Sequence, residues 1–213
     1  MVKVEPFRGY VAYSYYDLGS DLDCEDLWYV EITKDKVEFR RLIWDEVNLT
    51  DEEIAKAYDN YRVIHEKVFN KVDELIDRIR DKRCPLCNRK MKVIAKRRAR
   101  KPYHGYALLK RYYPDINSYD EKSDYTFTCF KCGVKCSVHY DTWDGGAVLN
   151  WSYVIEKDGK SAGYSKTGYY NNERHFLMYK HFIEDLHQMG LLEVEENDTL
   201  QTDSKAQGKP QVC

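Results

Sequence analysis

Two Cys-x-x-Cys pairs, separated by 41 residues, constrain this chain more than any other feature of its sequence. The first pair is Cys84 and Cys87, and the second is Cys129 and Cys132. A two-residue spacing in a tight turn lets both sulfurs point at one ion, so two pairs supply four thiolates in a tetrahedral arrangement. The sequence therefore predicts one structural Zn²⁺ per chain, in a closed site that leaves no position for water or substrate.

The number of cysteines and the hydropathy of the chain favour metal binding by the cysteines over disulfide formation. Seven cysteines are an odd number, and no stretch approaches the ~20 apolar residues of a membrane-spanning helix. The first residues carry acids where a signal peptide would need an apolar core. We therefore expect a soluble, intracellular protein in a reducing compartment. Cys136 and His139 are possible spare ligands, but strand alternation favours core or sheet positions for them, and Cys24 and Cys213 have no partner motif.

The cysteine turns and their adjoining strands resemble the zinc-ribbon group. In that group each CPxCG-like turn, or knuckle, joins two strands. Here CPLCN leads into MKVIA, and CFKCG joins YTFT to VKCSVHY. Asn88 and Gly133 follow the second cysteine of each knuckle, where the backbone commonly adopts a positive φ. The resemblance covers only these segments, and the gap exceeds the ~15–20 residues usual between such pairs. It implies a structural zinc without specifying a function.

Hydrophobic patterns outside the knuckles predict an α+β fold with a small N-terminal sheet, a long helix, an expanded zinc ribbon continuing into an antiparallel meander, and a C-terminal helix. Strands are expected at 8–16, 27–33 and 36–43, with a solvated acidic loop over 17–26. The meander comprises strands at 125–130, 134–143, 147–156 and 161–169. The predicted regions are a small antiparallel β region (1–49), the long helix (50–83), the ribbon with a basic insertion and the meander (84–170), the C-terminal helix (171–192) and a disordered tail (193–213).

The long helix carries an apolar heptad seam. Thr50 and Glu53 form a capping-box signature at its start, and neither Gly nor Pro interrupts the chain before Pro85. The seam comprises Ile54, Tyr58, Tyr61, His65, Val68, Val72, Leu75 and Ile79. Two interpretations are open: burial against the protein's own sheet, or a coiled-coil homodimer through the 54–79 seam. His65 is interpreted as a core histidine.

Residues 82–114 form a basic segment with 12 Lys or Arg and no Asp or Glu, although the formal net charge of the chain is −2. A strand is expected over 91–95, followed by a Tyr-rich loop or short helix over 99–120. Cations interleaved with tyrosines suit a phosphate backbone with exposed bases. The predicted DNA or RNA contacts are Lys92, Lys96, Arg97, Arg98, Arg100, Lys101, Tyr103, Tyr106, Lys110 and Arg111.

These features favour a zinc-stabilised, non-enzymatic nucleic-acid-binding accessory or regulatory protein. The main alternative is a dimeric protein-interaction module that binds an acidic partner in a transcription or replication complex. High Tyr and modest Ala content is similar to small proteins of archaeal viruses and bacteriophages, which would favour a host-factor inhibitor. A zinc-supported nuclease, using His104 with His139 and Asn150, is the third interpretation, although the chain contains no common catalytic motif.

Overall fold

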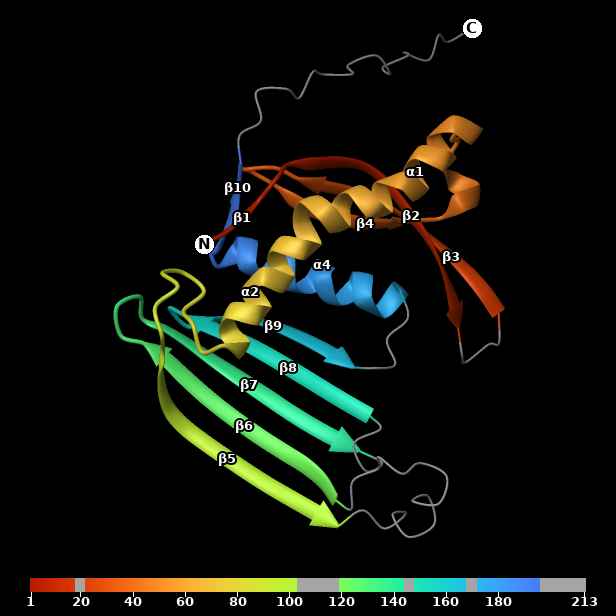
Figure 1. Cartoon of the computed structure of the whole chain (residues 1–213). Helices are drawn as coiled ribbons and strands as arrows, with labels where there is room; N and C mark the ends of the chain where they lie inside the picture. The colour runs from red at the N-terminus through yellow and green to blue at the C-terminus, as the bar shows by residue number, and fades with distance from the viewer. Residues whose placement is uncertain (18–21, 103–118, 144–147, 168–171, 196–213) are drawn as a thin grey trace, which may run out of the picture.

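The computed structural model describes residues 1–17, 22–102, 119–143, 148–167 and 172–195. Within them the chain forms a mixed architecture of helices and strands, with a three-stranded sheet, a five-stranded sheet and a short two-stranded pair. Figure 1 shows the C-terminal helix between the three-stranded and the five-stranded sheets, and the first half of the long helix across the three-stranded sheet.

The three-stranded sheet confirms the predicted N-terminal strands. It consists of β2 (Phe7–Asp17), β3 (Leu22–Ile32) and β4 (Val37–Leu42), which are antiparallel in chain order. A single 3-10 turn, η1 (Trp44–Glu46), leads from this sheet towards the long helix.

The predicted acidic loop over 17–26 is wrong for its second half, because β3 already begins at Leu22. Asp26 lies opposite Tyr13 in the strand register and is only 3% exposed. It accepts a hydrogen bond from the Tyr13 hydroxyl (3.0 Å) and pairs with Arg41. A buried carboxylate requires such partners, and these come from neighbouring strands rather than from the loop itself. Residues 18–21 lie outside the described residues.

The long helix begins where the sequence predicts. It comprises α1 (Asp51–Ile64), a π turn, η2 (His65–Phe69), and α2 (Asn70–Arg80). The complete capping box of Thr50 and Glu53 is present. The π turn was not predicted, since the spacing of the seam is compatible with an uninterrupted α-helix.

The heptad seam is buried within the single chain over its C-terminal part. Val68, Val72, Leu75 and Ile79 are at most 1% exposed and belong to the main core. In α1, by contrast, the fully buried residues are Ala57 and Ile64, and the predicted seam residues Ile54, Tyr58 and Tyr61 are only half-buried. The interpretation of burial against the protein's own sheets therefore accounts for the seam, and the coiled-coil interpretation has no support from it.

The five-stranded sheet extends the predicted meander by one strand. It is an antiparallel series of β5 (Lys92–Pro102), β6 (Tyr119–Cys129), β7 (Val134–Trp143), β8 (Val148–Lys157) and β9 (Lys160–Thr167). The predicted loop or short helix over 99–120 is wrong at both ends, because 99–102 continue β5 and 119–120 start β6. Residues 103–118 lie outside the described residues. Long-range pairing with β6 keeps the charged β5 extended, which local propensity does not indicate.

The C-terminal helix α4 (Asn172–Gln188) lies between the two larger sheets (Figure 1). Phe176 of α4 is fully buried, and its ring contacts those of Tyr13, Trp28 and Phe39 from the smaller sheet. Phe182 contacts Tyr164 of β9. One aromatic core thus joins both sheets through this helix.

The end of α4 and the residues beyond it differ slightly from expectation. Gly190 ends the helix with φ 65°, a backbone conformation that glycine adopts without steric cost. β10 (Leu192–Val194) then pairs in parallel with β1 (Val2–Val4), so the predicted tail over 193–213 does not start at residue 193. Residues 196–213 lie outside the described residues.

Candidate metal centre

Two knuckles position the four paired cysteines. The first connects α2 to β5, and there the Asn88 amide donates to the Cys84 carbonyl (2.9 Å). The second connects β6 to β7, and there the Gly133 amide donates to the Cys129 carbonyl (2.9 Å). Asn88 and Gly133 have φ of 57° and 66°, which confirms the predicted positive φ after each pair.

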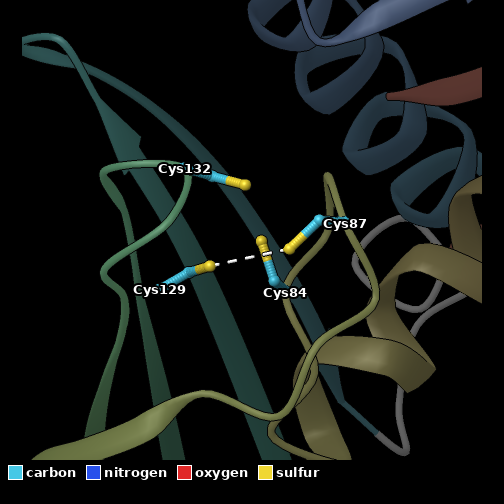
Figure 2. A group of neighbouring side chains, drawn as sticks. All are labelled: Cys84, Cys87, Cys129 and Cys132. Atoms are coloured by element: carbon cyan, nitrogen blue, oxygen red, sulfur yellow. Dashed lines mark hydrogen bonds between the residues drawn. The ribbon is translucent and has the colours of Figure 1, made fainter.

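Figure 2 shows the four cysteine side chains converging from the two loops. Their sulfur atoms all lie within 4.8 Å of one another, and the sulfurs of Cys87 and Cys129 are 3.7 Å apart. Zn–S bonds of about 2.3 Å place the corners of a regular tetrahedron about 3.8 Å apart. Cys84 and Cys129 are buried, while Cys87 and Cys132 are half-buried. The donor set and its spacing therefore fit a metal ion such as zinc.

The local electrostatics of the cluster also favour a cation. Burial raises the pKa of the Cys84 thiol to about 12, although the backbone amides of Cys87 and Leu86 oppose that rise. The backbone amide of Arg89 lowers the pKa of Cys87 to about 7. The neighbouring Cys87 side chain is the main cause of a raised pKa at Cys132. Four adjacent thiolates would repel one another, and a divalent cation between them offsets that repulsion.

The two possible spare ligands lie outside the cluster. Cys136 is fully buried on β7, where burial raises the pKa of its thiol to about 12. The Nδ1 atom of His139 is bonded to the Asp124 carboxylate of β6. Within the described residues the only metal-compatible group contains Cys84, Cys87, Cys129 and Cys132. The interpretation of Cys136 and His139 as core and sheet residues is confirmed.

The long gap between the cysteine pairs contains a β-hairpin arm. β5 leaves the first knuckle and β6 returns to the second, and the two strands pair from Lys92 opposite Thr128 to Pro102 opposite Tyr119. The cysteine cluster therefore lies at one end of this hairpin, and the basic residues of β5 extend away from it.

The predicted nucleic-acid contacts divide into described and undescribed groups. The side chains of Lys92, Lys96, Arg97, Arg98 and Arg100 are exposed on β5, which is an edge strand of the five-stranded sheet. The backbone of Lys101 continues this strand. The predicted contacts Tyr103, Tyr106, Lys110 and Arg111 lie outside the described residues, as does His104 of the nuclease interpretation.

Charge pairing differs between the two ends of β5. At the far end, Arg100 pairs with Glu121 (2.7 Å). Closer to the cysteine cluster, Lys92, Lys96, Arg97 and Arg98 have no carboxylate within 4.0 Å among the described residues. Asp124 lies opposite Arg97 in the register, but its carboxylate is bonded to His139. The uncompensated positive charge is therefore concentrated near the knuckles.

Three cations contact Tyr125 of β6. The ammonium groups of Lys96 and Lys82 lie 5.6 Å and 6.0 Å from the centre of its ring, and Arg98 donates to its hydroxyl (2.9 Å). The hydrogen bond from Arg98 lowers the pKa of Tyr125. Lys82 follows α2, so this contact brings the end of the helix and the middle of β5 onto one basic surface.

One exposed residue of the second knuckle was not singled out from the sequence. Phe130 is 77% exposed, between the ligand pair Cys129 and Cys132. No local signal in the sequence marks this exposure, because the residue at the equivalent position of the first knuckle, Pro85, is buried.

Comparison of the chain with known protein families, with curated proteins and with solved structures gave no significant match. Among the described residues, no helix has the length and apolar character that crossing a membrane requires. The function is therefore inferred from the residues and geometry of this chain.

Proposed function

We propose that this protein is a zinc-stabilised, non-enzymatic nucleic-acid-binding accessory or regulatory protein. One structural zinc per chain, bound by Cys84, Cys87, Cys129 and Cys132, holds the two knuckles together. The observation that carries the proposal is the row of exposed cations near the knuckle end of β5, without carboxylate partners among the described residues. Such a surface suits the regularly spaced phosphates of a nucleic acid.

A second basic feature adjoins this surface. A surface pocket beside the first knuckle is lined by Arg80, Asp81, Lys82, Arg83 and Lys90. Four of these five residues are cations, and Lys82 also contacts the same tyrosine ring as Lys96. The pocket therefore extends the positive surface from β5 around the end of α2, which supports contact with more than one phosphate.

The test is binding of fluorescent single- and double-stranded DNA and RNA oligonucleotides at several salt concentrations. A triple variant with Lys96→Gln, Arg97→Gln and Arg98→Gln is compared with the wild type. Each phosphate contact contributes about 0.7 to the slope of log affinity against log salt for single strands, so the slope should become shallower by about 2. Lower affinity at every salt concentration is also expected.

The matched control carries the same change of charge on the long helix, with Lys56→Gln, Arg62→Gln and Lys71→Gln. This control should bind like the wild type, because its cations lie on α1 and α2 rather than on β5. Equal effects of the two triple variants would mean that only net charge matters. If the wild type bound no oligonucleotide even at low salt, the basic surface would instead be assigned to an acidic protein partner.

A further inference from the structure

Phe130 differs from every other phenylalanine of the chain in its exposure. The sequence contains seven phenylalanines. Six of them are at most 7% exposed, namely Phe7, Phe39, Phe69, Phe127, Phe176 and Phe182. Phe130 is 77% exposed at the tip of the second knuckle. The fold therefore buries its other six phenylalanine rings and leaves this one in solvent.

The surroundings of the Phe130 ring are positively charged. The ammonium group of Lys92 lies 6.0 Å from the centre of the ring, and neighbouring Lys131 is exposed. Neither lysine has a carboxylate within 4.0 Å among the described residues. An apolar ring between unpaired cations suits a ligand that combines a flat π face with negative charge.

The knuckle holds the ring on a defined backbone. The amides of Cys132 and Gly133 donate to the Cys129 carbonyl at 3.2 Å and 2.9 Å. The flanking ligand pair, Cys129 and Cys132, anchors the turn on both sides of Phe130. Ligand binding therefore costs little backbone conformational entropy at this turn, and this preserves the affinity for a stacked ligand.

We infer that Phe130 stacks on an unpaired base of a single-stranded nucleic acid, while Lys92 and Lys131 contact the flanking phosphates. This inference rests on the proposed function and adds to it the strandedness of the ligand. In a duplex each base is covered by its neighbours, so an aromatic side chain finds a free base face only in single strands, loops or ends. The ring thus selects single-stranded over double-stranded ligands.

The experiment compares Phe130→Ala with the wild type on three probes. The probes are a single-stranded oligonucleotide, an abasic strand with the same number of phosphates, and a duplex. Stacking of one base on an aromatic ring contributes about 1–3 kcal/mol, so the variant should bind the base-bearing strand about 5- to 150-fold more weakly. Binding of the abasic strand and of the duplex should be unchanged.

Further variants separate stacking from other effects. Phe130→Tyr should retain binding because it keeps an aromatic face, whereas Phe130→Leu should behave like Phe130→Ala. Ile43→Ala removes an apolar side chain of similar exposure, 60%, beside the other sheet and should have no effect. Far-ultraviolet circular dichroism and zinc content should match the wild type in every variant, since the Phe130 side chain is outside the core.

Two outcomes would overturn the inference and leave the proposed function in place. In the first outcome, Phe130→Ala binds the base-bearing strand as tightly as the wild type does, although the triple variant of Lys96, Arg97 and Arg98 binds it weakly. The other is an equal loss on the base-bearing and abasic strands, because the ring then acts on something other than a base. Absence of wild-type binding to all three probes would overturn the inference and the proposed function together.

Discussion

At the residue scale, His65 shows how the core alters a side chain's chemistry. It lies in the π turn, with its ring centre 4.7 Å from those of both Tyr61 and Phe69. Burial lowers the pKa of His65, nearby Asp73 raises it, and His175 lowers it further. The net direction is downward, so the folded protein favours the neutral imidazole, as the interpretation of a core histidine requires.

This lowered pKa predicts a pH dependence of stability. The unfolded histidine has a pKa of about 6.5, so as the pH falls the unfolded chain binds this proton before the folded chain does. The free energy of unfolding should therefore decrease from about pH 6.5 down to the lower folded pKa, with a slope of at most about 1.4 kcal/mol per pH unit. His65→Phe should remove this contribution.

Urea unfolding of the wild type and of His65→Phe, between about pH 7.5 and pH 5.5, provides the measurement. The difference between the two proteins isolates His65, because proton uptake by the cysteine cluster and by His175 is common to both. Parallel pH profiles for the two proteins would show that His65 titrates alike in the folded and unfolded states.

At the element scale, the π turn sets the relative orientation of the two halves of the long helix. α1 buries Ala57 and Ile64, whereas α2 buries Val72, Leu75, Ile76 and Ile79. A π turn contains one residue more than an α turn, which rotates the following helix by about 100° relative to an uninterrupted α-helix. This extra residue sets the rotation at which Ala57 of α1 packs in a smaller cluster with Ala12 and Leu27, while the apolar residues of α2 pack into the main core.

Deletion of Glu66, an exposed residue of the π turn, should therefore disrupt the core. An uninterrupted α-helix would turn one of the two apolar faces towards solvent. Each Val, Leu or Ile exposed costs about 1.5–3 kcal/mol, so the apolar residues that α2 buries together cost an amount comparable with a typical total stability of about 5–15 kcal/mol. We expect the cooperative unfolding transition in urea, monitored by circular dichroism, to be lost.

The control for this deletion is Glu66→Ala, which keeps the helix length. It removes only the exposed ion pair between Glu66 and Arg62 (2.8 Å), and such a pair contributes about 0.3–0.5 kcal/mol. A deletion variant as stable as this control would mean that the π turn does not determine the helix register.

At the scale of the whole molecule, the cysteine cluster joins segments that the chain separates widely. The first knuckle follows α2, which packs into the aromatic core, and the second lies between β6 and β7. Zinc bound by both knuckles would therefore fasten the basic edge of the larger sheet to the helix. Elemental analysis should find one zinc per chain.

The double variant Cys84→Ser with Cys129→Ser should contain no zinc and show no cooperative unfolding transition. Binding of structural zinc contributes about 10–16 kcal/mol, which is comparable with the whole stability of a typical domain. Cys136→Ala is the matched control, because this cysteine is buried close to the second knuckle but lies outside the cluster. It should retain the metal. If the metal-free double variant were as stable as the wild type, the structural role of zinc would be contradicted.

The features that the sequence by itself determined are those set by interactions within a few residues. The Cys-x-x-Cys spacing implied the tight turn of each knuckle, and the capping box marked the first residue of the long helix. The residue types at Asn88 and Gly133 implied the positive φ that each knuckle adopts. Local sterics and local hydrogen bonds govern all of these, so a short window of sequence contains the information they need.

Only the tertiary structure decided which segments pair and which side chains are buried. β1 and β10 pair across almost the whole chain, through Val2 and Leu192, and β6 holds β5 as a strand despite its charge. Burial of Asp26 depends on its partners Tyr13 and Arg41, and the exposure of Phe130 contrasts with the burial of Pro85 at the equivalent position of the first knuckle. These outcomes depend on contacts between residues far apart in sequence, whose free energies local patterns do not encode.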